Sequence, residues 1–395
     1  MWEVSVKILY TAVDTPIPGT HGGSVHAQEL CLALARRGHT VHLIAPPGIS
    51  PNGTASAAAA RDGLHLHHVR QPPRFLEWAA VGKVRDLATA LSPDVVVERF
   101  YTFGGAGIWA AHSLGLPAVL EVNSPARPFP GLRDTLDRLT LVRPVDRWRR
   151  RLLRWSDAVY ATSRHLVPPE MQSSVTVVTN GVDTERFRPG PARPTSGPLR
   201  CVYVSSFRSW HGASNLVEAV ALCVARHVDL RVTCVGRGPR LAEARRATRH
   251  AGLDGTIRFV GDVPAADVPR YLAGADVGLA PFSPTEFNAL RLGWFWSPIK
   301  IFEYLAAGLA VVTADLPELR ALLPDTVARF YTPGAVGELA DELEQLATHT
   351  EALGPVRQIA RELAETRYTW GHQASVVEGL LEDVLARRRA RGSYL

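Results

Sequence analysis

The segment that carries most chemical information runs from Ser297 to Gly308 and reads Ser-Pro-Ile-Lys-Ile-Phe-Glu-Tyr-Leu-Ala-Ala-Gly. Ser297 has the side chain of a helix N-cap, Pro298 suits the first helical position, and Gly308 is a typical stop. The apolar run at 309–313 predicts a buried strand. The start of such a helix offers free N–H groups and a partial positive charge, so it favours an anion such as a phosphate.

Two charged side chains inside this expected helix suit the same chemistry. Lys300 adds a cation in the first turn, in a chain that has only three lysines among its 44 Lys and Arg residues. Glu303 lies about a turn and a half into the helix, where its carboxylate can accept hydrogen bonds from a ribose. The alternative is an ordinary helix–strand unit with a surface Glu and a surface Lys.

A second candidate phosphate site lies near the N-terminus. Gly22 and Gly23 follow the first apolar run and open an expected helix that continues through Ser24 and His26. Glycines let the backbone approach a ligand closely, and the start of a helix favours negative charge. A pair of glycines alone is equally typical of a tight turn, so this interpretation depends on the motifs that accompany it.

Short apolar runs alternate with helical patterns along the chain, which is the signature of parallel βαβ units. In the first half we expect strands at 4–11, 40–45, 64–69, 94–97, 117–122, 158–162 and 175–178, and helices at 24–37, 81–91, 105–114 and 136–155. In the second half we expect strands at 200–204, 230–235, 256–260, 277–281 and 310–313, and helices at 213–225, 240–251, 268–273, 336–347, 353–368 and 373–389.

A segment rich in Pro and Gly, residues 189–198, separates the two halves and cannot form a core element. A chain of 395 residues is also too long for one ordinary core. We therefore expect an N-terminal domain over residues 1–189 and a C-terminal domain over residues 199–371. Ligands of such sheets lie beyond the carboxyl ends of the strands.

These motifs, in this order, resemble the GT4 family of retaining glycosyltransferases, which have the GT-B fold. The likeness runs from Lys7 to about Trp370, and the segment at 297–308 resembles the donor site of the family. The resemblance implies an α/β protein with two doubly wound Rossmann-like domains that face each other across a cleft. It also implies that a final helix, within residues 372–395, packs back on the first domain.

The resemblance assigns the donor nucleotide sugar to residues of both halves. Gly22 and Gly23 would face the diphosphate. The residues that would hold the diphosphate and the sugar at the start of the motif helix are Ser297, Pro298, Ile299 and Lys300. The nucleoside would contact Glu303 through its ribose, with Val263 and Arg237 in two turns that resemble those of the family.

Two features depart from the family pattern. Where the family commonly has an Arg and, five residues later, a Lys that pair with the diphosphate, this chain has Ser206 and His211. A serine cannot neutralise a phosphate, whereas His211 can when protonated, or can donate one hydrogen bond. Arg208 is a candidate for the missing charge. The Glu-x7-Glu pattern is half present, because Phe295 stands at the first position and Glu303 at the second.

The acceptor candidates lie at strand ends of the first half and at its first helix: His26, Glu98, Arg99 and Glu121. Asn123 stands where relatives often carry a His close to the reacting sugar, and together with His211 it is our catalytic candidate. An Asn can bind a sugar or acceptor hydroxyl but cannot act as a general base. The alternative is a buried Asn that caps its loop.

The implied reaction is a front-face displacement with retention, in which the departing diphosphate takes the proton of the acceptor. Such a reaction needs no metal or other cofactor, and the sequence has no Asp-x-Asp motif. Catalysis would rest on positioning and on stabilising the leaving diphosphate. Two alternatives stay open: a pseudo-glycosyltransferase or sugar-nucleotide epimerase of the same fold, and a non-catalytic nucleotide-sugar-binding partner.

Composition sets further limits. The net charge of +6 would help an anionic sugar nucleotide approach, and no nucleic-acid motif accompanies it. No apolar run reaches about 18 residues, and the N-terminus lacks a basic region followed by an apolar core. We therefore expect a cytoplasmic protein without a spanning helix. The four cysteines lack metal-ligand spacing and are expected to be core thiols.

The densest basic run lies at residues 147–155 and carries five arginines and two tryptophans. We favour a solvated helix face with snorkelling arginines over a membrane-surface or acidic-partner face. An excess of Arg, Ala, Pro and Gly with few Lys is typical of a GC-rich bacterial genome. We expect a UDP-sugar as donor and a small molecule, natural product or glycan with a hydroxyl or amine as acceptor.

Overall fold

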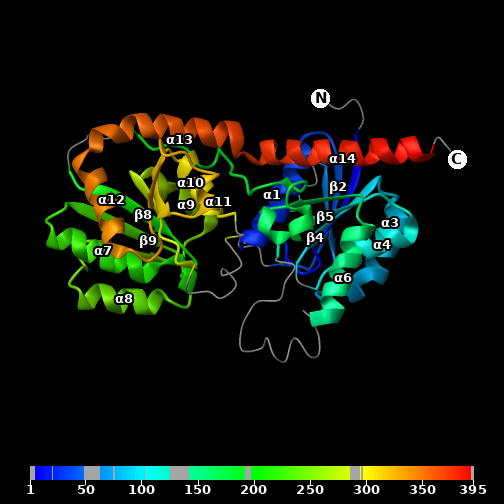
Figure 1. Ribbon diagram of the computed structural model, residues 1–395, viewed down its shortest axis with the longest axis horizontal. Coiled ribbons are helices and arrows are strands. Elements are labelled where there is room, and N and C mark those ends of the chain that lie inside the picture. Colours follow the sequence, from blue (N-terminus) through cyan, green and yellow to red (C-terminus); the bar gives the residue numbers. More distant parts are fainter. Residues whose placement is uncertain are drawn as a thin grey trace. The chain divides into compact units, whose positions relative to one another are not determined.

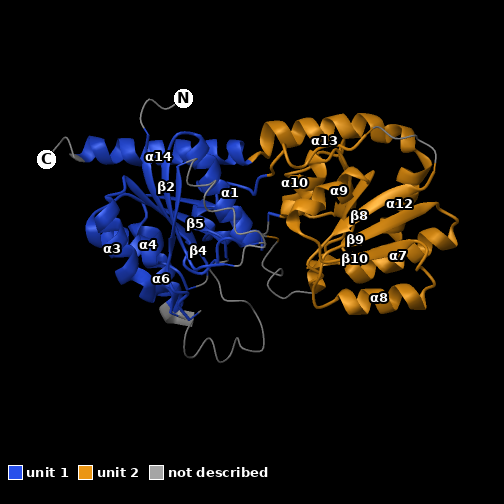
Figure 2. Ribbon diagram, turned by 180° about the vertical axis from the view of Figure 1, so that it is seen from behind, with its two compact units in different colours: residues 1–181, 295–297, 370–395 blue, residues 182–294, 298–369 orange. Residues whose placement is uncertain are grey.

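The computed structural model describes residues 5–19, 21–48, 63–73, 76–101, 103–124, 142–191, 197–284, 294 and 297–392. The chain forms two compact units, which Figure 2 shows in different colours. Unit 1 consists of residues 1–181, 295–297 and 370–395, and unit 2 of residues 182–294 and 298–369. None of the helices in these described ranges is long and apolar enough to cross a membrane.

Unit 1 is built on a seven-stranded sheet with the order β3-β2-β1-β4-β5-β6-β7, in which every neighbouring pair is parallel. The strands are β1 (Lys7–Thr11), β2 (Thr40–Ala45), β3 (Leu64–His68), β4 (Val95–Phe100), β5 (Ala118–Val122), β6 (Ala158–Ala161) and β7 (Thr176–Val177). All residues of the central strands β4 and β5 are buried, as expected for a parallel sheet covered on both faces.

The helices of unit 1 are α1 (Gly22–Arg36), α3 (Val81–Leu91), α4 (Ala106–Leu114), α6 (Val142–Trp155) and α14 (Trp370–Gly392). The last helix, red in Figure 1, packs beside α1, while α4 lies between α3 and α6. Trp370, Val377 and Leu381 join the core that α1 makes with β1 and β2. Burial of these side chains is what holds a helix so distant in sequence on this sheet.

Unit 2 is built on a six-stranded parallel sheet with the order β10-β9-β8-β11-β12-β13. Its strands are β8 (Leu199–Val204), β9 (Leu230–Val235), β10 (Ile257–Gly261), β11 (Val277–Ala280), β12 (Ala310–Ala314) and β13 (Ala328–Tyr331). Its helices are α7 (Ala213–Ala225), α8 (Leu241–His250), α9 (Val268–Ala273), α10 (Ile299–Ala306), α11 (Pro317–Arg320), α12 (Val336–Thr348) and α13 (Leu353–Arg367). Helix α7 packs beside α8 and α12, and α10 packs beside α13 (Figure 1).

Both sheets reverse their strand order at one place, between β1 and β4 in unit 1 and between β8 and β11 in unit 2. In open parallel sheets, ligands bind beyond the carboxyl ends of the strands at such a switch point. Each unit therefore offers one favoured edge for a site.

The boundary between the units differs from the sequence prediction. The segment from Val182 to Gly190, which we expected to close the first domain, belongs to unit 2. Its backbone is held there by α13, because Arg361 donates to the carbonyls of Phe187 and Thr184, and Val182 N–H donates to the carbonyl of Tyr368.

Two short elements were absent from the prediction, namely β13 and α11. β13 has four residues and contains an arginine, so its sequence lacks the apolar run that marked the other strands. It forms nonetheless, because its backbone pairs with β12 at the edge of the sheet. Tertiary context thus overrides a weak local signal.

Arg361 tests this account of the boundary segment. Its guanidinium lies 2.6 Å from the Phe187 carbonyl, 2.8 Å from the Ala306 carbonyl and 2.9 Å from the Thr184 carbonyl. We expect Arg361→Leu to lower the free energy of unfolding of unit 2 by about 2 kcal/mol, because charge-assisted hydrogen bonds are lost. Urea unfolding measures the change, with the exposed Arg246→Leu on α8 as the control. Equal losses of unfolding free energy in Arg361→Leu and Arg246→Leu would contradict the assignment of Arg361 to holding the boundary segment.

Candidate functional site

The donor motif of unit 2 starts differently from the prediction. Helix α10 begins at Ile299, with Pro298 as its N-cap and no side-chain cap. Ser297 is not the cap, because its hydroxyl accepts a hydrogen bond from the N–H of Asn180 and its carbonyl accepts one from the Asn180 amide. The first N–H groups of α10 are therefore left without a side-chain acceptor, as a ligand site requires.

Lys300 is the most unusual cation of unit 2. Its ammonium lies over the rings of Tyr203 and Phe282, at 5.4 and 5.3 Å from their centroids. The nitrogen is out of contact with water and has no hydrogen-bond partner in the described part of the chain. Burial lowers its pKa to about 7, against the opposing effect of Glu303. A cation held in this way costs free energy that a bound anion would offset.

Glu303 lies one turn further along α10. Burial raises the pKa of its carboxyl to about 7, although Arg186 and Lys300 act in the other direction. Within the described ranges, none of its carboxylate oxygens accepts a hydrogen bond from the protein. The carboxyl thus remains available to sugar hydroxyls, which is the geometry that the predicted ribose contact needs.

The structure favours one of the two roles that the sequence left open for His211, the donation of a single hydrogen bond. The residue ends a 3-10 turn, Ser209–His211, and its Nδ1 lies 2.9 Å from the hydroxyl of Ser205. Burial lowers its pKa to about 2, with further lowering from Lys300 and Arg208. His211 is therefore neutral at physiological pH and can stabilise a phosphate by only one donated hydrogen bond. Because Ser205 accepts the N–H of Phe207, its own proton is free for Nδ1, which leaves the His211 proton on Nε2.

The loops after β8 and β9 approach each other closely at this edge. A Cβ on Gly236 would lie 1.9 Å from the Ser205 carbonyl, and one on Gly238 would lie 1.8 Å from the Ser206 carbonyl. Both glycines have positive φ, so other residues would be strained as well as crowded. This contact fixes the loop that carries Ser206 and Arg208, two exposed residues of the predicted diphosphate site.

The two predicted nucleoside residues other than Glu303 lie on neighbouring turns of unit 2. Arg237 pairs with Asp262, with 3.3 Å between Nε and Oδ2, and both side chains are exposed. Val263 follows Asp262 and is half-buried. The pair therefore joins the turn after β9 to the turn after β10. Phe295, the position where the first glutamate of the family pattern is missing, lies outside the described residues.

In unit 1 the predicted acceptor residues gather around Glu121, which is fully buried at the end of β5. Its carboxylate accepts hydrogen bonds from the hydroxyls of Tyr10 and Tyr160 at 2.5 Å and from the Asn123 amide at 2.6 Å. His26 Nε2 lies 2.8 Å away. Three donated hydrogen bonds and the contact with His26 use the lone pairs of this carboxylate. Glu121 therefore acts as a positioning residue in this arrangement, and its contact with the acceptor stays a prediction.

The electrostatics of Glu121 follow from this arrangement. Burial alone would raise its pKa, but His26, then Arg99 and the Tyr10 hydroxyl, outweigh that effect and bring the pKa down to about 2. Glu121 is thus an anion at every physiological pH.

His26 is held from both sides of its ring. Nδ1 lies 2.7 Å from the side-chain oxygen of Asn180, and Nε2 faces Glu121. The Asn180 amide group is committed to the Ser297 carbonyl, so it is the Asn180 oxygen that faces His26. Both ring nitrogens thus face oxygen atoms, which fixes the orientation of the ring. The ring edge also packs on Trp370.

Glu98 is a helix cap in the structure. Its two oxygens accept hydrogen bonds from the N–H groups of Gly105 and Ile108, at 2.6 and 2.8 Å, at the start of α4. Burial raises its pKa to about 7, although these N–H groups lower it. Its side chain is almost fully buried, and its contact with the acceptor stays a prediction.

The guanidinium of Arg99 packs against the Gly22–Gly23 segment at the start of α1. Its guanidinium donates to the Thr15 hydroxyl at 2.8 Å and lies 3.5 Å from an oxygen of Asp14. A Cβ on Gly23 would come within 2.8 Å of this guanidinium, so the turn sits directly against it. Arg99 is buried, and we assign it to holding the segment that opens α1.

Asn123 is half-buried. Among the acceptor and catalytic candidates of unit 1, it is the one that keeps solvent contact beyond its bond to Glu121.

Sequence reasoning missed the residues that connect these candidates: Tyr10, Tyr160, Asn180 and Arg186. Asn180 stands in an Asn-Gly-Val-Asp run, a composition typical of a turn. The tyrosines stand in apolar runs and look like core residues. A buried phenol needs a hydrogen-bond partner, and that was the available signal.

The described residues hold no group of three or more His, Cys, Asp or Glu side chains suited to a metal ion.

Comparisons with known proteins agree with this arrangement. Residues 20–186 match the family model described as Glycosyltransferase Family 4, and residues 198–349 match the model described as Glycosyl transferases group 1. The chain belongs to the GT4 family of glycosyltransferases. It is 24% identical to a glycogen synthase of Mycobacterium tuberculosis, over 92% of each chain. It is 25% identical to a phosphatidyl-myo-inositol mannosyltransferase of the same organism, over 93% of this chain and 94% of the relative.

Solved structures show the same fold. The Anabaena protein HepE in complex with UDP superposes with a TM-score of 0.70 at 17% identity, over 95% of this chain and all of that one. These likenesses confirm the predicted GT-B fold with its two Rossmann-like sheets. The two family models, both of glycosyltransferases, give the activity of the protein.

The depressed pKa of Glu121 makes a prediction about acid stability. Its ordinary pKa of 4.5 applies in the unfolded chain, which therefore takes up the proton first as the pH falls. The stabilisation of about 3 kcal/mol is present above pH 4.5 and is lost between pH 4.5 and 2. We expect Glu121→Gln to destabilise unit 1 by about 3–5 kcal/mol near neutral pH, and by much less near pH 3.

Urea unfolding at several pH values measures this difference. Tyr160→Phe is the matched control, because it removes one donor and keeps the charge, and it should cost about 1 kcal/mol with most of the acid sensitivity retained. Parallel stability curves of the native protein and Glu121→Gln would show that the carboxylate does not carry the effect.

Proposed function

We propose that this glycosyltransferase moves a sugar from a nucleoside diphosphate to a hydroxyl- or amine-bearing acceptor with retention of the anomeric configuration. A UDP-sugar is the favoured donor, and a small molecule, natural product or glycan is the favoured acceptor. The observation that carries the donor assignment is the buried ammonium of Lys300, which has no hydrogen-bond partner among the described residues, beside the uncapped start of α10. A diphosphate is the anion that this position suits best. HepE, solved with UDP and with UDP-glucose, supports the choice of base by likeness of fold.

Positive potential for the leaving diphosphate comes, in this proposal, from Lys300, the first N–H groups of α10 and the Nε2–H of His211. Preorganised donors of this kind stabilise charge that develops in the transition state. A metal ion is then not required.

Retention with assistance from the leaving group fits the state of the remaining candidates. His211 is too weak a base at a pKa of about 2 to take a proton from an acceptor. Glu98 is committed to helix N–H groups, and Glu121 to the Tyr10 and Tyr160 hydroxyls, the Asn123 amide and the contact with His26. Neither can therefore act as a nucleophile. The departing diphosphate remains as the base. Asn123 would orient the acceptor or the sugar by hydrogen bonds.

Binding of UDP, GDP, ADP and dTDP, measured by calorimetry, tests the donor site. We expect UDP to bind best, and Glu303→Ala and Lys300→Met each to weaken it by about tenfold or more, because a charge-assisted contact is lost. Glu351→Ala, an exposed carboxylate of the same unit, should bind as the native protein does. Preference for another base would overturn the UDP assignment, and no binding at all would overturn the donor site.

The neutral state of His211 makes a separate prediction. We expect His211→Ala to lower kcat by roughly 100-fold, because one donor to the leaving group is removed, and His211→Gln to lose less, because an amide N–H can replace it. Release of the nucleoside diphosphate measures the rate. Between pH 5 and 8 the native protein and His211→Gln should give pH profiles of the same shape. A step in the native profile that His211→Gln abolishes would show that His211 is protonated during catalysis.

A further inference from the structure

Four histidines lie on two neighbouring strands at one edge of the unit 1 sheet: His42 on β2, and His65, His67 and His68 on β3. None of them has a place in the donor or acceptor assignments. β3 is the edge strand, and His42 lies directly opposite His65 in the register of the pair. Because imidazole is the commonest protein ligand of transition metal ions, these strands are a candidate metal site.

Strand alternation places three of these side chains on the same face of the sheet. Leu43 of β2 and Leu66 of β3 pack with the core that α1 makes. Successive side chains of a strand point to opposite faces, so His42, His65 and His67 all point away from that core. The three imidazoles therefore share the other face of the β2–β3 pair.

Two of the three rings lie within reach of a single metal ion. Nδ1 of His42 is 3.0 Å from Nε2 of His67. Two nitrogens at this separation, each about 2.05 Å from a metal ion, subtend an angle of roughly 95° at the ion. That angle is close to the right angle of a tetragonal site, which Ni²⁺ and Cu²⁺ favour with nitrogen ligands. The observed separation thus suits two ligands of one ion as well as a hydrogen bond.

An ion between the two rings takes the place of the proton that they share. In the hydrogen bond one of the two nitrogens is protonated, whereas a metal ion needs a lone pair from each of them. The proton moves to the other nitrogen of the same ring, so both imidazoles stay neutral and no net proton is lost. The ring of His65 stacks on His42, with 4.9 Å between centroids and 22° between planes. This contact holds His42 in place while the half-buried His67 turns toward the ion.

The protonation state of the pair agrees with a role as ligands. Burial, then His65, His67 and Lys7, lower the pKa of His42 to about 4. Burial, then His65 and His68, also lower the pKa of His67. Both imidazoles are therefore neutral at physiological pH. Metal ligands must be deprotonated, so this pair binds an ion without first paying for the loss of a charge.

We propose that His42 and His67 bind one divalent transition metal ion, of the kind that prefers imidazole, and that water completes its coordination. The site has two protein ligands, which agrees with the finding that no three ligand side chains of the described residues meet at one point. It is independent of the proposed function, because it uses none of the donor or acceptor residues. The ion joins β3 to β2, and it thereby clips an edge strand that is paired on one side only.

Calorimetry of the full chain, without an affinity tag, tests the site. We expect Ni²⁺ and Zn²⁺ to bind and Mg²⁺, which prefers oxygen ligands, not to bind. His42→Gln and His67→Gln should each raise the Kd for Ni²⁺ at least tenfold, because a glutamine amide can keep a hydrogen bond but is a poor ligand. The matched control is His68→Gln, an exposed neighbour on the other face of β3, which should bind Ni²⁺ as the native protein does.

Thermal unfolding gives a second measurement on the same variants. An ion that binds only the folded chain stabilises it, so Ni²⁺ should raise the unfolding temperature of the native protein and of His68→Gln, but not that of His67→Gln. Scans without metal show that each variant is folded, and the half-buried His67 carries the test if His42→Gln does not fold.

Three results would overturn the proposal. The first is a native protein that binds neither Ni²⁺ nor Zn²⁺. The second is native affinity for Ni²⁺ in a folded His42→Gln or His67→Gln variant, which would leave the pair as an ordinary hydrogen bond. The third is an equal loss of affinity in His68→Gln, which would show that Ni²⁺ binds elsewhere among the histidines of this edge.

Discussion

The architecture of unit 1 depends on one buried anion. An isolated carboxylate cannot remain charged inside a protein, so Glu121 must meet its donors or lose its charge. The donors come from β1, β6, α1 and the loop after β5, namely Tyr10, Tyr160, His26 and Asn123. Satisfying them together fixes the register of three strands relative to α1. Because His26 also binds Asn180, and Asn180 binds Ser297, the same network reaches the residue before Pro298, the N-cap of the donor helix.

Two buried ionisable groups of helix α10 in unit 2 lack hydrogen-bond partners of this kind among the described residues. The Lys300 ammonium faces aromatic rings, and the Glu303 carboxyl accepts no protein hydrogen bond in the described part of the chain. Their pKa values move toward neutral for this reason. A fold that leaves two ionisable groups of one helix unsatisfied gives up stability at that place, which is typical of a binding site. We therefore assign the Glu121 network to the stability of the fold, and Lys300 and Glu303 to ligand binding.

Much of this could be predicted from sequence. Continuous apolar runs, as in β4 and β12, and amphipathic helices bounded by glycine gave the two sheets and most element ends within a few residues. The family resemblance rested on chemistry-bearing residues in order, and it gave the fold. The sequence could not show that Glu98 and Glu121 point inward, because strand alternation is uninformative where both faces are buried. Nor could it give the charge of His211, since that depends on burial beside Lys300, which lies 89 positions further along the chain.

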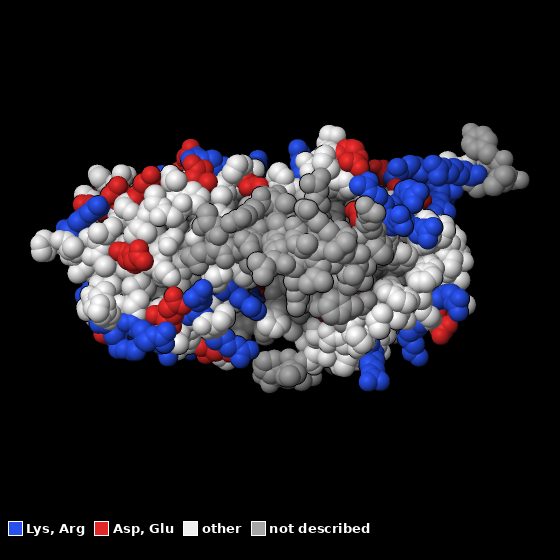
Figure 3. All heavy atoms as spheres, turned by 60° about the horizontal axis from the view of Figure 1, so that its bottom comes forward, with Lys and Arg blue, Asp and Glu red and all other residues white. Residues whose placement is uncertain are grey.

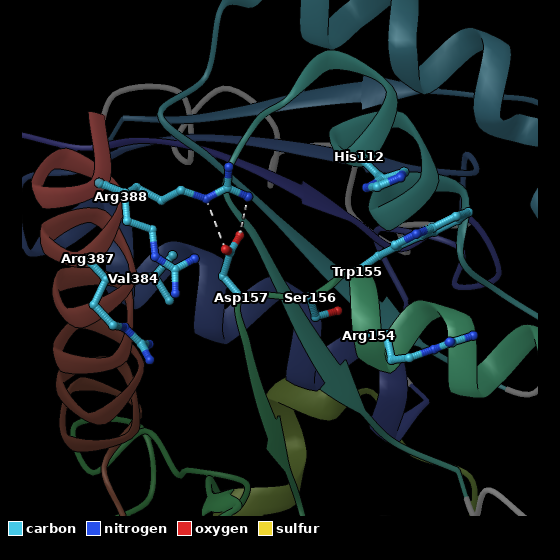
Figure 4. A pocket seen from close by; sticks show the side chains of 9 residues that line it. His112, Arg154, Trp155, Ser156, Asp157, Val384, Arg387 and Arg388 are labelled. Atoms are coloured by element: carbon cyan, nitrogen blue, oxygen red, sulfur yellow. Dashed lines mark hydrogen bonds and ion pairs between the residues drawn. The ribbon is translucent and has the colours of Figure 1, made fainter. Parts of the chain in front are cut away.

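We interpreted the arginines of α6 as a solvated face, and Arg150, Arg151 and Arg154 are exposed in the structure, whereas Arg149 is buried. Taken alone, one helix with several exposed arginines needs no partner, because each guanidinium is hydrated and screened by salt. Lys and Arg side chains form several groups on the surface that Figure 3 shows. The structure adds a second helix, α14, whose arginines line one cavity together with Arg154 (Figure 4). Arg388 of α14 binds Asp157 through two contacts of 2.9 Å, and Asp157 directly precedes β6. This bidentate pair joins residues that lie 231 positions apart in the sequence. It therefore arises from the packing of α14 on unit 1, and from no property of either element by itself.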